Sequence, residues 1–205
     1  FGDTIIIGAP HNNDVGPNAG QVRVFKYDGS TWNLKGLPIN GQAAGDKFGY
    51  DVCMSSDSNV IAIGANEHDE TPGGNDGTVR VYYWSGSSWV QRGFDLNGLE
   101  DPSGDGAMYG HSVSLSDNGM KLAVSSAYFG LSAGYVEVYE FDGSAWIGLG
   151  EIMYGQNETN LGYNVALSGD GNRLTIGSWS DNPVVTYEFV VTTSSPCLNG
   201  ATCAD

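Results

Sequence analysis

The sequence predicts an all-β fold, a β-propeller built from four-stranded antiparallel blades. The first observation is a short phrase that occurs as YDGSTW, WSGSSW and FDGSAW, with each tryptophan 57 residues after the previous one. The second is that segments with alternating apolar residues recur at the same period. The third is that no segment has the apolar spacing of an amphipathic helix. Internal repeats of this length, with four strands in each, are typical of propeller blades.

Each phrase follows a segment in which alternate residues are apolar: QVRVFKY, TVRVYYW or YVEVYEF. This period of two indicates a β-strand with one buried face. The phrase itself predicts a tight hairpin, because Gly adopts the positive φ that such turns need and the flanking aromatic residues pack on the strands. The residues expected on the buried face are Val22, Val24, Val79, Val81, Val136 and Val138.

Two more strands precede each hairpin. The segments DTIIIGAP, NVIAIGAN, MKLAVSSA and NRLTIGSW align without gaps. Three of them follow a further apolar segment, FGYDVCMSSDS, YGHSVSLSDNG or LGYNVALSGDG, whose polar end signals a turn. A solenoid is the competing interpretation, but its repeats would be shorter. The aligned positions are Ile5, Ile61, Leu122 and Leu174 in one register, and Ile7, Ile63, Val124 and Ile176 in another.

The pairing of Phe48-Gly49 with Gly64-Ala65, together with the complete Gly8-Ala9-Pro10, resembles the FG-GAP repeat of integrin α-type propellers. The resemblance covers residues 1 to about 191, and its motifs degrade along the chain. It implies a ring of seven blades. About three and a half blades are present, with predicted bounds of 1–45, 46–104, 105–157 and 158–191. We therefore expect a partial propeller that belongs to a larger protein, with the missing half before Phe1.

Residues 192–205 predict a linker and the start of a second module. The segment SSPCLNGATCAD resembles the opening of an EGF-like module, with Cys197 and Cys203 at the cysteine positions. The cysteine that this family usually carries a few residues earlier is missing, so the disulfide partners of both residues stay open. Asn157 lies in the only N-glycosylation sequon, Asn-Glu-Thr, and is the predicted glycan site.

Composition favours an extracellular protein and excludes some partners. The net charge is −16 and the isoelectric point is about 4.2. Nucleic acid is therefore excluded as a partner, because phosphates are bound by Lys and Arg, and an anionic membrane surface is disfavoured. No apolar segment approaches the ~20 residues of a membrane-spanning helix.

No catalytic motif is present, so the sequence predicts that this segment is not an enzyme. It lacks a Gly-x-Ser-x-Gly elbow, a His-Glu-x-x-His helix, a Cys-x-x-Cys pair and a Walker loop. His11, His68 and His111 lie in three different repeats, and nothing nominates a Ser-His-Asp arrangement. Cys53 is expected to be a small buried residue of a strand.

Calcium is the one cofactor that the sequence leaves open. The connections between the first two strands of each blade are too short for the calcium loop of integrin-type blades. Two longer connections carry oxygen ligands, although polar loops of an acidic protein usually serve only solubility. The candidate ligands are Asn12, Asp14, Asp69, Glu70 and Asp76.

Aromatic residues at equivalent positions form the candidate binding site. Tyr50, His111 and Tyr163 each follow the glycine of the FG-like pair, at the start of the innermost strand. We expect them near the central opening of the ring, where they either hold a sugar or a partner loop or only cover the contact between blades. Trp179 is the further candidate, on a loop.

These observations predict a non-catalytic binding or structural module of an extracellular surface, matrix or adhesion protein. Its partners would be proteins or other subunits of an assembly. The alternative is a carbohydrate-binding, lectin-like propeller, attached to a catalytic domain elsewhere. Fold alone does not decide between them.

Overall fold

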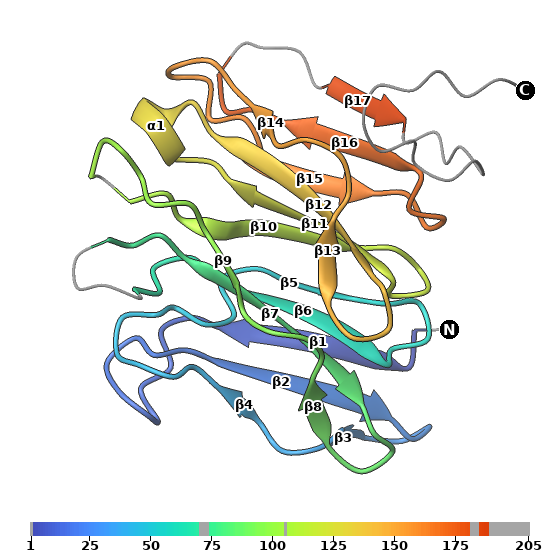
Figure 1. Cartoon of the computed structure of the whole chain (residues 1–205). Helices are drawn as coiled ribbons and strands as arrows, with labels where there is room; N and C mark the ends of the chain where they lie inside the picture. The colour runs from blue at the N-terminus through green and yellow to red at the C-terminus, as the bar shows by residue number, and fades with distance from the viewer. Residues whose placement is uncertain (1, 70–73, 105, 181–184, 189–205) are drawn as a thin grey trace, which may run out of the picture.

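The computed structural model describes residues 2–69, 74–104, 106–180 and 185–188. These residues form four antiparallel β-sheets that follow one another in chain order across the molecule (Figure 1). The predicted all-β class is confirmed, because strands build every sheet and each strand pairs with its neighbour in antiparallel register.

The strands have the following bounds. The first sheet contains β1 (Thr4–Ala9), β2 (Gln21–Tyr27), β3 (Trp32–Leu34) and β4 (Ile39–Asn40). The second contains β5 (Val52–Met54), β6 (Val60–Ala65), β7 (Thr78–Trp84), β8 (Trp89–Gln91) and β9 (Leu96–Asn97). The third contains β10 (Tyr109–Leu115), β11 (Lys121–Ser126), β12 (Tyr135–Phe141), β13 (Trp146–Gly148) and β14 (Met153–Tyr154). The fourth contains β15 (Asn164–Leu167), β16 (Arg173–Gly177) and β17 (Val185–Glu188).

The outermost strand of each of the first three sheets is split, where the sequence predicted one continuous strand. In the second sheet, β8 pairs with one end of β7 and β9 pairs with the other end. A glycine causes each break: Gly36, Gly93 and Gly150 have φ values of 85°, 83° and 83°. This left-handed conformation bends an edge strand as a β-bulge does.

The predicted hairpins are present, but their loops have four residues rather than a two-residue step. In the first hairpin, Tyr27 pairs with Trp32 and the Asp28 N–H donates to the Thr31 carbonyl at 3.1 Å. The Asp28 carboxylate accepts the N–H groups of Ser30 and Thr31 at 2.8 and 2.9 Å. The polar second residue of each phrase therefore closes its loop by a side-chain turn, and Ser85 and Asp142 accept the equivalent N–H groups at 3.1 and 2.8 Å.

One helical turn, α1 (Phe129–Ser132), interrupts a sequence in which no helix was expected. Its inner residues Gly130 and Leu131 have φ values of 60° and 57°, so it is a tight turn in a loop and not a regular helix. Within the described ranges, no helix is long and apolar enough to cross a membrane.

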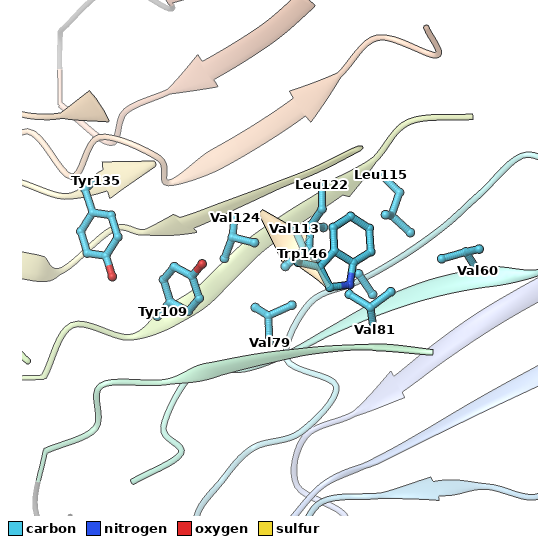
Figure 2. Close-up of a cluster of buried hydrophobic side chains, with 11 residues drawn as sticks. Val60, Val79, Val81, Tyr109, Val113, Leu115, Leu122, Val124, Tyr135 and Trp146 are labelled. Atoms are coloured by element: carbon cyan, nitrogen blue, oxygen red, sulfur yellow. The ribbon is translucent and has the colours of Figure 1, made fainter. Parts of the chain in front are cut away.

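The core lies between successive sheets. The aligned valines and isoleucines predicted to point inward meet there: Val22 and Val24 of β2 pack against Ile61 and Ile63 of β6. Figure 2 shows the next junction, where Val79 of β7 faces the third sheet. The buried residues of that junction are Val60, Ala62, Val79, Val81, Tyr109, Val113, Leu115, Leu122, Val124, Tyr135 and Trp146.

Glycine lets β1 and β6 lie close to the starts of β5 and β10 in the next sheet, and a side-chain hydrogen bond links the start of β5 to β10. A Cβ atom on Gly8 would collide with the carbonyl oxygen of Gly49, and one on Gly64 would collide with that of Gly110. Moreover, the Asp51 carboxylate accepts the Val113 N–H of the next sheet at 2.8 Å. These contacts explain the paired glycine motifs, and they bring the starts of β5, β10 and β15 together.

Candidate functional site

Five aromatic side chains from three sheets form one continuous cluster. Tyr50, His111 and Tyr163 lie at the starts of the innermost strands of the second, third and fourth sheets, as their sequence positions predicted. Tyr128 and Trp179 follow β11 and β16. We call these five residues the aromatic cluster.

His111 is the centre of the aromatic cluster. Its ring centroid lies 5.3 Å from Tyr50, 4.9 Å from Tyr163 and 5.5 Å from Tyr128. Tyr163 continues the cluster to Trp179, with a centroid distance of 4.8 Å. Interplanar angles between 47° and 62° describe tilted and edge contacts, the arrangement that aromatic quadrupoles favour.

Burial changes sharply across the cluster. His111 is 7% exposed, whereas Tyr50 and Trp179 are 43% and 71% exposed. Burial therefore lowers the pKa of His111, which keeps the imidazole neutral at neutral pH. Its Nε2 lies 3.5 Å from the Tyr50 hydroxyl, and its Nδ1 has no hydrogen-bond partner among the described residues. Burial also raises the pKa of Tyr50.

The aromatic cluster thus has a buried centre, His111, and two side chains, Tyr50 and Trp179, with exposed aromatic faces. The half-buried Tyr128 and Tyr163 pack against the buried His111, and Tyr50 and Trp179 present their surfaces to solvent. Such rings contact apolar or cationic groups and the flat faces of sugars at small cost in conformational entropy. The neutral imidazole adds a group that can accept a proton or a hydrogen bond.

The candidate calcium ligands do not gather around one point. Asp14 accepts the side-chain amide of Gln21 at 2.9 Å, and Asn12 accepts the Asp14 N–H at 2.9 Å. In the second sheet, Asp69 accepts the N–H of Asn75. Burial and the neighbouring carboxylates raise the pKa of Asp76. Glu70 lies outside the described residues, among which no three His, Cys, Asp or Glu side chains come together as a metal site.

The other predicted positions are placed as follows. Cys53 lies on β5 and packs against the core, where burial raises the pKa of its thiol and keeps it protonated. Asn157 is exposed in a turn between the third and fourth sheets. Cys197 and Cys203 lie outside the described residues.

Sequence reasoning missed one repeated pair of residues. Lys35 and Arg92 each stand three residues after the tryptophan of the phrase, so they have the same 57-residue spacing. Lys35 Nζ lies 5.2 Å from the ring centroid of Trp89, and Arg92 Cζ lies 5.9 Å from that of Trp146. The spacing was visible in the sequence, but Lys and Arg at an edge strand are ordinarily solvated.

The comparisons with known proteins give a fold and not a family. No protein-family model and no curated protein sequence matches the chain. A solved structure of a candidate 6-phosphogluconolactonase from Bacteroides uniformis ATCC 8492 is similar to it, with 12% sequence identity and a TM-score of 0.55. The match covers 82% of this chain and 44% of that one, so the chain spans less than half the length of the structure it matches.

This match contradicts the prediction that the segment is not an enzyme. The prediction rested on missing motifs, whereas the similar structure is named as a candidate enzyme. A site assembled from single residues of separate sheets has no local motif, because its members are far apart in the sequence. The absence of a motif is therefore no evidence against catalysis on this fold.

Proposed function

We propose that the four sheets are consecutive blades of a β-propeller, a seven-bladed ring when complete. We further propose that the chain is a binding module of an extracellular surface, matrix or adhesion protein. Three features support the architecture: the repeated four-stranded pattern, the contacts between successive innermost strands, and a match that spans 44% of a longer structure. The acidic composition and the exposed Asn157 support the location.

The observation that carries the binding function is the aromatic cluster. Three of its members, Tyr50, His111 and Tyr163, occupy equivalent positions of three sheets. Two members, Tyr50 and Trp179, expose large aromatic surfaces. Exposed tyrosine and tryptophan next to a rigid, buried base are typical of the residues that dominate binding energy in protein interfaces. The proposed partner is therefore a protein that inserts an apolar or cationic side chain between Tyr50 and Trp179.

A carbohydrate ligand is the alternative for the same surface, because the open face of Trp179 can contact a sugar ring. The labelled chain would be applied to an array of extracellular proteins and to a glycan array. We expect saturable protein binding that weakens by about tenfold or more in Trp179→Ala and Tyr50→Ala, the loss typical of a central aromatic contact. Phe94→Ala is the matched control, because Phe94 is 84% exposed and lies on an outer strand break.

The outcomes separate the ligands. Saturable glycan binding with the same dependence on Trp179 would replace the protein partner by a carbohydrate. Binding that is equally weakened by Phe94→Ala, or no saturable binding on either array, would refute the proposed function.

Catalysis is the second candidate function, and His111 is the observation that favours it. A buried, neutral imidazole beside a tyrosine hydroxyl can take a proton from water that attacks an ester carbonyl. The similar structure suggests 6-phosphogluconolactone as the first substrate to test. Hydrolysis above the buffer rate that is lost in His111→Asn would support this function, and a rate equal to that of buffer would exclude it for this substrate.

A further inference from the structure

The first sheet has one apolar face that no described residue covers. We call it the first face: Ile5, Ile7, Phe25, Tyr27, Trp32 and Leu34, which share one side of β1, β2 and β3 by their register. The exposed Arg23, which pairs with Ile7, lies on the same side and borders these apolar residues. Ile5, Ile7 and Leu34 are 38%, 48% and 50% exposed. A contiguous exposed apolar patch of this kind marks an interaction surface.

The same positions of the second sheet are buried against the first sheet. Ile61 and Ile63 are the equivalents of Ile5 and Ile7, and both are fully buried against Val22 and Val24 of the first sheet. Trp89 replaces Trp32, and its indole N–H donates to the Lys35 carbonyl of the preceding sheet at 2.7 Å. In the third sheet, Trp146 donates to the Arg92 carbonyl at 2.9 Å. The first two junctions therefore each use one tryptophan of the following sheet to contact one residue of the preceding sheet.

The same two junctions also place a cation of the preceding sheet against aromatic rings of the following one. Lys35 Nζ lies 5.3 and 5.2 Å from the ring centroids of Trp84 and Trp89. The same ammonium donates to the Ser58 carbonyl at 2.5 Å and to Asn59 Oδ1 at 3.2 Å. The binding site of the Lys35 ammonium therefore combines two aromatic rings, a backbone carbonyl and the side chain of Asn59, the residue directly before β6.

The junction of the second and third sheets has an equivalent cation site, in which Arg92 replaces Lys35. Arg92 Cζ lies 4.0 Å from the Phe141 centroid, close above the ring. Its two Nη atoms lie 3.1 Å from the Gly119 carbonyl oxygen and 3.0 Å from Met120 Sδ. Asn59 and Met120 hold equivalent positions in their sheets. The Asn59 carbonyl accepts the N–H of Trp84, the last residue of β7, and the Met120 carbonyl accepts that of Phe141, the last residue of β12, both at 2.8 Å.

The first sheet has the same two aromatic rings and the same backbone position as these cation sites. Tyr27 and Trp32 have a centroid distance of 5.3 Å, equal to that of the pairs in the second and third sheets. The Asp3 carbonyl accepts the Tyr27 N–H at 2.6 Å, so Asp3 stands where Asn59 and Met120 stand. Its side chain is a carboxylate, 54% exposed and 3.9 Å from the Lys26 ammonium. This site thus supplies a carboxylate where the two occupied sites supply the Asn59 amide oxygen and the Met120 sulfur.

We propose that the first face binds one further sheet of the same repeat, which inserts a Lys or Arg side chain between Tyr27, Trp32 and Asp3. This inference rests on the proposed propeller and adds the chemistry of the docking residue. The opposite face of the fourth sheet is not a suitable occupant, so a second copy of the chain docking through it is not expected. Thr175 pairs with Thr186 there, at the position where the other sheets present Val24, Val81 and Val138.

The test adds such a sheet to the whole chain. Residues 46–118 would be joined to Gly2, because Gly119 and Gly2 hold equivalent positions before the second strand. The added segment supplies a complete sheet with its own Arg92 and an innermost strand for the first sheet. Trp32 would be followed by 19F NMR of the 5-fluorotryptophan-labelled protein, with Trp32→Phe to assign its signal and acrylamide to measure its exposure.

We expect Trp32 to become as protected as Trp89. Arg92→Gln in the added segment, or Asp3→Asn in the chain, should lower the ratio of docked to undocked protein by roughly 2- to 30-fold, the range of a cation held on aromatic rings. Arg173→Gln is the control, since Arg173 is an exposed cation on β16 of the fourth sheet and belongs to neither the first face nor the two described cation sites.

Three results would overturn the proposal. If Trp32 is protected but neither Arg92→Gln nor Asp3→Asn changes the docked fraction, the proposed role of the cation is refuted and the proposed propeller stands. If Trp32 stays exposed, whether the added segment folds apart from the chain or stays unfolded, both the proposed docking at the first face and the proposed propeller are refuted. Self-association of the unextended chain that is lost in Trp32→Ala would assign the first face to a second copy.

Discussion

Ile5 and Ile61 occupy the same position of neighbouring sheets, yet one is 38% exposed and the other is fully buried. Trp32 and Trp89 differ in the same way: the first is 44% exposed, and the second donates a hydrogen bond to the preceding sheet. The residue types and their registers are alike, so the difference comes from the neighbour. Alternation along a strand tells which face a side chain is on, and only a second sheet makes that face a core.

The largest expected effect separates the two isoleucines. Ile61→Ala should lower the free energy of unfolding by about 2–5 kcal/mol, because it leaves a cavity between the first two sheets. Ile5→Ala should cost about 1 kcal/mol or less, since its side chain is partly in water. Urea denaturation of both variants measures the difference, and equal losses would mean that the first face is covered in solution.

A smaller effect is expected for the two tryptophans. Trp89→Phe removes the indole N–H that bonds to the Lys35 carbonyl and should cost about 0.5–1.5 kcal/mol. Trp32→Phe should change stability by less than about 0.5 kcal/mol. The same denaturation experiment applies, with the Trp146→Phe variant as an internal repeat of the first change. If Trp89→Phe proves neutral, the indole hydrogen bond does not stabilise the junction.

The smallest effect concerns His111, and it depends on pH. Burial lowers its pKa, so the unfolded chain binds a proton at higher pH than the folded chain does. The neutral folded form is therefore favoured above the unfolded pKa of about 6.5, and stability decreases as the pH falls below that value. His111→Asn should make the free energy of unfolding less dependent on pH between about 7.5 and 5.

The exposed His11 provides the matched substitution for this measurement. Comparing His11→Asn with His111→Asn separates the effect of the buried ring from the loss of a histidine in general. A pH dependence that persists unchanged in His111→Asn would show that the burial of His111 does not cause it.

Much of this fold could be predicted from the sequence. Val22, Val79 and Val136 were placed on a buried face by alternation alone, and all three are fully buried. The equivalence of Tyr50, His111 and Tyr163 followed from their position after glycine, and their side chains do come together. These predictions succeeded because they depend on short-range pattern and on repetition.

The remaining features depend on contacts between sheets, which local pattern does not contain. The breaks of the outer strands follow from positive φ at Gly36 and its equivalents, and a glycine in a strand has several structural meanings. Lys35 and Arg92 looked like solvated edge residues, and only the aromatic rings of the next sheet give them a role. The burial of His111 likewise results from residues more than fifty positions away in the sequence.

The two ends of each junction differ in thickness, and this has a geometric consequence. Between the second and third sheets, the backbones of Gly64 on β6 and Gly110 on β10 are in contact, whereas at the outer strands the Trp146 indole and the Arg92 side chain lie between the sheets. These sheets are therefore inclined to one another and do not stack in parallel. Gly64→Ala would force β6 and β10 apart, because the added Cβ would collide with the Gly110 carbonyl oxygen, and would reduce the inclination between the second and third sheets.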